Sequence, residues 1–270
     1  MVKALLVFLN GLVALSVANA ARRAPWGKFL KDQETSGDVD YAVVVSVTQA
    51  GLCSGSILSE TYVLTAAHCV QDAPPRHITI HYDMGADMEN SIRVKSVKIH
   101  PYYTKELPLK NNLAILELEN SIPLGNGIGA VTLPELYEPT AANATAILAG
   151  FGHSHHFGRM VKKLHVGKLR VYPDEECEKI YDIVDKEYHI CASGQYGTKA
   201  TCKGDQGAPL AVNGVQIGLV SWGPSVCGDP NVTGVFSKLS SNVAWIKYMI
   251  GNKNVEPSFY DDCDCECGCP

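Results

Sequence analysis

The sequence has no excess of positive charge and, after its first twenty residues, no long apolar run. Its 270 residues contain 23 Lys and Arg against 28 Asp and Glu, which gives a net charge of −5 at pH 7. Nucleic-acid-binding proteins usually carry a basic patch or stripe, so the composition argues against a nucleic-acid partner. A bilayer span needs about 20 apolar residues. No stretch beyond residue 20 qualifies, so we expect no membrane span.

The first twenty residues have the composition of a secretory signal peptide. Lys3 precedes an apolar run over residues 4–17, and A-N-A at residues 18–20 fits a small-residue cleavage site. The alternative, a membrane anchor, is disfavoured because the run is short for a bilayer. Ten cysteines are many for a reduced cytosolic chain and ordinary for a secreted one. We therefore expect a secreted, extracellular and soluble protein.

Short runs of β-branched and other apolar residues predict strands from residue 41 onward. Residues 78–82 alternate apolar and polar side chains, which is the pattern of a half-buried strand. One helix is expected over residues 242–250, with Asn242 as its N-cap and Gly251 as its stop. Many short strands separated by Gly, Pro and Asn clusters predict an all-β barrel or sandwich. The expected strands lie at residues 43–47, 78–82, 92–99, 113–116, 146–149 and 215–219.

Four segments resemble motifs of the trypsin/chymotrypsin family of serine proteases. Residues 202–210, C-K-G-D-Q-G-A-P-L, resemble the nucleophile loop, which reads G-D-S-G-G-P-L in the family. Residues 65–69, T-A-A-H-C, match the catalytic-histidine segment, and residues 111–116, N-N-L-A-I-L, resemble N-D-I-A-L-L. Residues 221–223, S-W-G, match the edge strand that pairs with substrate. The resemblance covers residues 40–252. It implies an all-β fold of two packed six-stranded antiparallel β-barrels (chymotrypsin-like) with a C-terminal α-helix.

The resemblance places His68, Asn112 and Gln206 at the three positions of a catalytic triad. His68 stands at the position of the general base. A glutamine at the serine position has no usable nucleophile, because its nitrogen lone pair is delocalised into the carbonyl. In related proteases, loss of the serine costs roughly 10⁶ in kcat and Asp-to-Asn at the third position roughly 10⁴. We expect vestigial triad positions and no catalytic residue. Gly204 and Gln206 fall at the oxyanion-hole positions.

The activation sequence of the family is also missing. In active members, cleavage frees an I-V-G-G-like N-terminus whose amine pairs with the aspartate before the serine, which is Asp205 here. Residues 21–39 contain no such motif, since the nearest candidate, K-F-L-K at residues 28–31, lacks both glycines. We therefore expect a leader without an activation site, and an oxyanion hole in a collapsed, zymogen-like shape.

The same resemblance assigns a specificity pocket and three disulfides. Ala200 falls at the pocket base, where trypsins hold an aspartate, and Gly223 and Gly234 fall at its walls. An apolar base offers a charged side chain no partner, so the pocket is either a relic or an open apolar site. By closing a loop, each disulfide lowers the entropy of the unfolded chain and stabilises the fold by on the order of 3 kcal/mol. The expected pairs are Cys53–Cys69, Cys177–Cys191 and Cys202–Cys227.

Two clusters of potential metal ligands stand outside these motifs. Residues 253–270 form an acidic tail whose four cysteines could crosslink, form local disulfides or bind a soft metal. Three histidines at residues 153–156 could hold Zn²⁺ or Cu²⁺, although a solvated loop is the more common role. We assign no metal and no cofactor to either cluster. Asn143 and Asn231 begin N-glycosylation sequons. The tail cysteines are Cys263, Cys265, Cys267 and Cys269.

Together these features predict a secreted, catalytically inactive serine protease homologue of the kind frequent in arthropods. Such homologues bind other proteins as cofactors, decoys or inhibitors in melanisation, clotting or host complement. This role rests on family analogy. The expected partner is an extracellular protein, which the sequence does not identify. Two alternatives stay open: a peptidase with weak or unusual activity, and a structural or metal-handling protein that uses the Cys-rich tail.

Overall fold

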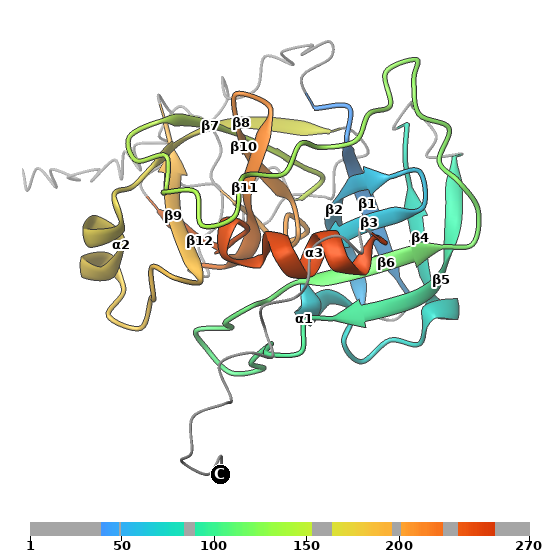
Figure 1. Ribbon diagram of the computed structural model, residues 1–270, viewed down its shortest axis with the longest axis horizontal. Helices are drawn as coiled ribbons and strands as arrows, with labels where there is room; N and C mark the ends of the chain where they lie inside the picture. Colours follow the sequence, from blue (N-terminus) through green and yellow to red (C-terminus); the bar gives the residue numbers. More distant parts are fainter. Residues whose placement is uncertain are drawn as a thin grey trace, which may run out of the picture.

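The computed structural model describes residues 39–48, 50–83, 90–152, 164–195, 201–223 and 232–251. Within these residues the strands form two closed, antiparallel barrels of six strands each (Figure 1). The strand order is β1-β2-β3-β6-β5-β4 in the first barrel and β10-β11-β12-β9-β8-β7 in the second. The predicted fold class is therefore confirmed.

The first barrel and the segments on it lie between residues 42 and 118, and the second barrel ends at residue 238. No helix in the described part of the chain is long and apolar enough to cross a membrane. The first barrel comprises β1 Ala42–Val47, β2 Gly51–Ser59, β3 Tyr62–Thr65, β4 Ile78–His81, β5 Ser91–Ile99 and β6 Ala114–Leu118. The second comprises β7 Thr145–Gly150, β8 His165–Val171, β9 His189–Gly194, β10 Pro209–Val212, β11 Val215–Trp222 and β12 Thr233–Lys238. The helices are α1 Ala67–Val70, η2 Pro75–His77, α2 Asp174–Ile180, η3 Ser240–Asn242 and α3 Val243–Met249.

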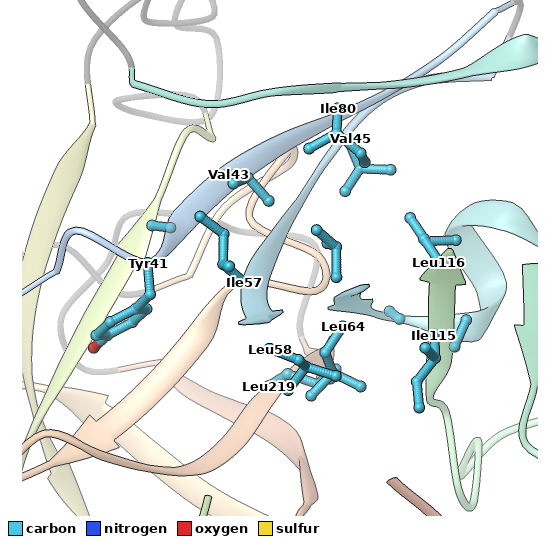
Figure 2. Close-up of a cluster of buried hydrophobic side chains, with 14 of the residues drawn as sticks. Tyr41, Val43, Val45, Ile57, Leu58, Leu64, Ile80, Ile115, Leu116 and Leu219 are labelled. Carbon is cyan, nitrogen blue, oxygen red and sulfur yellow. The ribbon is translucent and has the colours of Figure 1, made fainter. Parts of the chain in front are cut away.

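The core of the first barrel continues into the second. Figure 2 shows Leu219 of β11 beside Leu58 and Leu64 of the first barrel, and all three belong to one cluster of buried residues. Burying such a side chain contributes about 1.5–3 kcal/mol, so the shared cluster joins the barrels as well as filling one of them. The junction between the barrels is therefore a rigid surface on which a site can be built.

Helix α3 runs across this junction (Figure 1). Trp245 and Ile246 on its buried side pack into the shared core. The helix ends where predicted, because Gly251 adopts φ 94°. Asn242 is the N-cap residue of α3, as predicted, but its side chain makes no capping hydrogen bond. The Asn242 amide instead donates to the Lys238 carbonyl at 2.9 Å.

His100 anchors α3 to the first barrel. Its ring is 2% exposed and meets the Trp245 ring edge-on, with the ring centroids 4.6 Å apart. Burial lowers the pKa of His100 from 6.5 to about 4. The folded protein therefore holds this imidazole neutral against its aromatic partner at neutral pH.

The free energy of unfolding is expected to fall as the pH decreases from 6.5 to 4. The unfolded chain binds a proton at His100 in this range and the folded chain does not, so protonation favours unfolding. The pKa difference corresponds to about 3 kcal/mol. Urea denaturation at both pH values, on wild type and His100→Phe, measures the effect. Between pH 6.5 and 4, the free energy of unfolding should fall by about 3 kcal/mol less in His100→Phe than in the wild type. Equal losses in both proteins would contradict the assignment of this pH dependence to His100.

Candidate functional site

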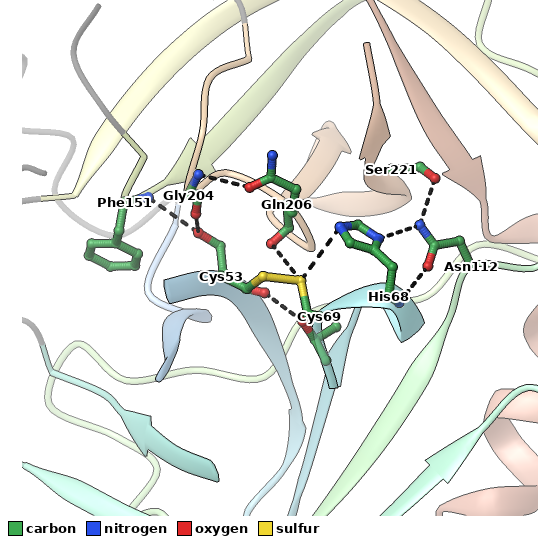
Figure 3. Close-up of a disulfide and its surroundings, with 10 residues drawn as sticks. Cys53, His68, Cys69, Asn112, Phe151, Gly204, Gln206 and Ser221 are labelled. Carbon is green, nitrogen blue, oxygen red and sulfur yellow. Dashed lines mark hydrogen bonds between the residues drawn. A yellow bond between two sulfur atoms is a disulfide. The ribbon is translucent and has the colours of Figure 1, made fainter. Parts of the chain in front are cut away.

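The side chains of His68, Asn112 and Ser221 form a hydrogen-bonded chain between the barrels (Figure 3). Asn112 is fully buried just before β6. Its Oδ1 accepts the backbone N–H of His68 at 3.0 Å, and its Nδ2 lies 2.8 Å from both His68 Nδ1 and Ser221 Oγ. Because a backbone N–H can only donate, the atom facing it is the amide oxygen. The amide nitrogen therefore points at the imidazole.

This orientation of Asn112 sets the tautomer of His68. A neutral imidazole has one accepting and one donating nitrogen. Since Nδ1 accepts from Asn112, the ring proton lies on Nε2. Burial lowers the pKa of His68 below 6.5, and a neutral amide supplies no negative charge to stabilise an imidazolium. The ring thus presents a donor at Nε2, where a general base must present a lone pair.

The side chain of Gln206 folds back onto the loop that carries it. Its Oε1 accepts the backbone N–H of Gly204 at 2.8 Å (Figure 3). By the sequence resemblance, this N–H is one of the donors that would stabilise an oxyanion. While it is bonded to the Gln206 carbonyl it stabilises no other oxygen. Position 206 therefore lacks a nucleophile, and its side chain also occupies the neighbouring donor.

Ser54 on β2 holds this loop against the first barrel. Its backbone N–H donates to the Gln206 carbonyl at 2.8 Å, and its hydroxyl donates to the Gly204 carbonyl at 2.9 Å. Gly207 follows with φ 82°, and a Cβ there would lie 2.3 Å from the Ser54 carbonyl oxygen. Only glycine fits this approach. None of the four sequence motifs includes Ser54, so these motifs gave no sign of this positioning role.

Asp205 is buried beneath the loop and bonded to the main chain. Its Oδ1 accepts the Gly152 N–H at 2.8 Å, and its Oδ2 accepts the Cys202 N–H at 2.9 Å. A Cβ at Gly152 would lie 2.5 Å from the carboxylate carbon, so glycine is required there. Residues 21–38, most of the expected leader, lie outside the described residues. The absence of an activated N-terminus at Asp205 thus stays a prediction.

The expected specificity pocket is described in part. A Cβ at Gly223 would lie 3.6 Å from the Gly234 Cα, so these two glycines are adjacent. Thr201, which the sequence analysis did not include, faces Gly234 with its hydroxyl oxygen 3.0 Å from a Cβ built there. Ala200, the expected base, lies outside the described residues. The pocket assignment therefore remains a prediction, with Thr201 added to it.

A loop of the first barrel crosses to the second beside Trp222. The Pro108 carbonyl accepts hydrogen bonds from Trp222 Nε1 at 2.8 Å and His189 Nε2 at 2.9 Å. Lys110 forms an ion pair with Asp185 at 2.8 Å. These partners are far apart in sequence, 114 residues between Pro108 and Trp222. No sequence signal predicted this contact, which ties down one side of the S-W-G strand.

Among the described residues, two of the three expected disulfides are present, Cys53–Cys69 and Cys177–Cys191. The first joins β2 to α1, the helix that carries His68 (Figure 3). Cys202 is disulfide-bonded, and its expected partner Cys227 lies outside the described residues.

The other predicted features are mostly outside the described part of the chain. This applies to Asn231, the histidines at residues 153–156 and the Cys-rich tail. Asn143 is exposed, and its Oδ1 accepts two hydrogen bonds from the Arg170 guanidinium at 2.7 and 3.2 Å. The described residues contain no group of three or more His, Cys, Asp or Glu arranged to hold a metal ion.

His68 is expected to carry its proton on Nε2 and to remain neutral when the pH is lowered to 6.5. Asn112→Asp should raise its pKa and move the proton to Nδ1, because a carboxylate accepts only and favours the imidazolium. Long-range ¹H–¹⁵N correlation spectra recorded against pH report both the tautomer and the pKa. The ring signals of His68 are identified as those that are absent from the spectrum of His68→Gln. An unchanged tautomer in Asn112→Asp would show that the amide does not set it.

Comparisons with known proteins agree on one family. The trypsin family model matches residues 31–246. Human kallikrein-4 is 33% identical over 201 residues, which cover 73% of this chain and 77% of kallikrein-4. Mouse neuropsin, a serine protease, superposes with a TM-score of 0.70 at 25% identity, over 80% of this chain and 96% of neuropsin. The scabies mite inactivated protease paralogue S-D1 superposes with a TM-score of 0.72 at 27% identity, over 82% of this chain and 96% of the paralogue. This chain therefore belongs to the trypsin family of serine proteases.

Proposed function

We propose that this trypsin-family protein is secreted, non-catalytic and acts by binding. It would bind an extracellular protein as a cofactor, decoy or inhibitor in a proteolytic or immune cascade. The observation that carries the proposal is the hydrogen bond from the Gly204 N–H to Gln206 Oε1. One side chain removes the nucleophile and also occupies a donor that the reaction needs.

Three requirements of acyl transfer fail together in this geometry. Gln206 supplies no hydroxyl, His68 presents a donor where it should accept a proton, and the Gly204 N–H is already bonded. Loss of one oxyanion donor alone costs about 10²–10³ in kcat, and loss of the serine roughly 10⁶. Triad losses are not additive. The absence of a nucleophile therefore dominates, and the other two changes oppose any simple recovery.

The retained scaffold is consistent with a binding role. Beside the triad positions, the scaffold keeps the S-W-G strand, the adjacent glycines Gly223 and Gly234, and the loop fastened by Pro108. The paralogue S-D1 is described as an inactivated protease, and its likeness to this chain suggests that the fold outlasts the loss of catalysis. Participation in melanisation, clotting or host complement rests on fold-level analogy.

The secreted state belongs to the same proposal. In this proposal the chain is organised as a signal peptide at residues 1–20, a leader at 21–39, the protease-like domain at 40–252 and the Cys-rich tail at 253–270. Two disulfides within the described residues agree with an oxidising compartment. Exposed Asn143 would accept a glycan, and we propose the same for Asn231.

Gln206→Ser alone is expected to remain at least about 10⁴-fold less active than a trypsin assayed in parallel, because Asn112 still imposes the wrong tautomer. Peptidase assays with a panel of peptide substrates on wild type, Gln206→Ser and Gln206→Ser/Asn112→Asp measure this. His68→Ala in each background is the control for contaminating protease. Hydrolysis by the wild type that His68→Ala abolishes would overturn the non-catalytic proposal.

Binding is tested on the same secreted, glycosylated preparation. Proteins captured from the extracellular fluid of the source organism are identified, and each is then purified. Its proteolytic processing is measured with and without this protein. We expect one cascade component to bind and its processing rate to change without hydrolysis by this chain. A saturating amount that alters no processing rate would contradict the regulatory role.

A further inference from the structure

The hydrogen bonds at the triad positions use the acceptors of the three side chains and leave donors over. Gln206 Oε1 accepts from the Gly204 N–H. Asn112 Oδ1 accepts the backbone N–H of His68, and His68 Nδ1 accepts from the Asn112 amide. Each of these acceptors therefore already has a donor inside the site. The atoms that remain are Nε2 of His68 and Nε2 of Gln206, and both of them donate.

The orientation of the Gln206 amide follows from its bond to Gly204. A backbone N–H can only donate, so Oε1 is the atom that faces it. Figure 3 shows the amide nitrogen on the side turned away from the Gly204 nitrogen. No residue in the described part of the chain accepts a hydrogen bond from this nitrogen, and Gln206 is only partly buried. Its two N–H groups are therefore available to a ligand.

The second donor, His68 Nε2, lies beside the same loop. Cys69 Sγ is 3.8 Å from His68 Nε2 and 3.9 Å from the carbonyl oxygen of Gln206, so the imidazole and residue 206 are neighbours (Figure 3). Sulfur is a weak acceptor, and no described residue offers Nε2 a stronger one. His68 is partly exposed. A stronger acceptor that enters from solvent can therefore take the hydrogen bond of the Nε2 proton.

The accessible charge on this loop is positive. Lys203 is exposed, and within the described residues no ion pair joins it to a carboxylate. Asp205, the acidic residue of the loop, is 1% exposed, and its oxygens accept the backbone N–H groups of Gly152 and Cys202. An anion that approaches residues 203–206 from solvent therefore meets the ammonium group and not the buried carboxylate.

We propose that His68 and Gln206 together bind a carboxylate of the protein partner, an inference that rests on the proposed function. A carboxylate only accepts hydrogen bonds, and its two oxygens can take them from two directions. Hydrogen bonds to an ionised acceptor are roughly twice as strong as those between neutral groups. The carboxylate has two sources in a protein: a C-terminus, which every proteolytic cleavage creates, and an Asp or Glu side chain.

The test is a titration of the full-length protein with three short peptides, followed in long-range ¹H–¹⁵N spectra of the His68 ring. The peptides are acetyl-Gly-Gly-Ala with a free C-terminus, the same peptide as its C-terminal amide, and acetyl-Gly-Glu-Gly amide. The first and third carry the two sources of carboxylate, and the second carries none. The shift of the Nε2 signal with peptide concentration gives each dissociation constant.

At least one of the two carboxylate peptides should bind with a dissociation constant of about 1 mM or tighter, because two hydrogen bonds to a charged group supply that affinity. Binding of the first alone identifies a chain end as the ligand, and binding of the third alone identifies an acidic side chain. The absence of saturable binding by both, or equal binding of the uncharged amide peptide, would overturn the proposal.

Gln206→Glu is the most specific variant, because its carboxylate is nearly the same size and can still accept from the Gly204 N–H. It replaces the two N–H groups with a negative charge, so binding of a carboxylate peptide should weaken by about tenfold or more. Asn120→Asp adds the same charge at an exposed position beyond the end of β6 and should change binding by less than about twofold. Equal weakening by both variants would contradict the proposal.

Two further variants test the other groups, and thermal melting confirms that each variant is folded. His68→Phe keeps an aromatic ring and removes the Nε2 donor, so carboxylate binding should weaken by about tenfold; because this variant lacks the reporting ring, its affinity is measured by calorimetry. Lys203→Gln should weaken binding by up to about fivefold at low salt and by less at high salt, as expected for an exposed charge. Unchanged affinity in His68→Phe would remove the imidazole from the site and contradict the proposal.

Binding should also raise the pKa of His68. Burial lowers this pKa in the free protein, whereas a carboxylate beside Nε2 stabilises the imidazolium. The pH titration of the His68 signals should therefore move to higher pH at saturating carboxylate peptide and stay in place with the amide peptide. A pKa that does not change at saturation would show that the carboxylate binds elsewhere, and would overturn the proposal.

Capture of the extracellular partner separates this proposal from the function on which it rests. A partner that the wild type captures and Gln206→Glu does not would support the carboxylate site as its docking point. A partner captured equally by both would exclude that contact while leaving the binding function in place. Carboxylate binding by a protein that captures no partner would support the site and count against the function.

Discussion

The geometry of the site depends on how Ser54 holds the loop of residues 204–207 across the junction of the barrels. One residue of β2 supplies a backbone N–H to the Gln206 carbonyl and a hydroxyl to the Gly204 carbonyl. The chain then passes so close to Ser54 that Gly207 has no space for a Cβ. The two barrels also share a buried apolar cluster, to which β2 contributes Ile57 and Leu58 and β11 contributes Leu219. These contacts from the first barrel use the backbone of the loop and not the side chain at position 206.

On this fixed loop, small chemical changes have large consequences. Asparagine and aspartate are nearly the same size, yet the amide donates where a carboxylate accepts, and this reverses the proton position on His68. The buried Asn112 satisfies its oxygen and both N–H groups through the backbone of His68, its ring and Ser221. Leaving any of these groups unpaired would cost about 1–3 kcal/mol. Every polar group of Asn112 therefore has a hydrogen-bond partner. Catalytic sites commonly differ, because they keep groups in destabilised arrangements that activity requires.

The proposed binding role fits a scaffold in which a loop of one barrel is fastened to the other barrel. Pro108 fastens a loop of the first barrel to Trp222 and His189 of the second, so the edge of the S-W-G strand is held in place. A rigid framework with binding features on its loops is the usual basis for such roles.

The sequence by itself determined the fold class, the chemistry missing at positions 112 and 206, and two cysteine pairs. The missing chemistry follows from short local motifs, and the fold class and the cysteine pairs follow from the family that those motifs indicate. Neither the periodicity nor a motif predicted β8, because Gly167 and Lys168 interrupt its apolar pattern. The tertiary structure decided which groups pair. The Asn242 amide bonds to Lys238, Gln206 turns to Gly204, and Pro108 meets Trp222 and His189. Hydrogen-bond partners depend on distances and directions between remote segments, which a linear pattern does not contain.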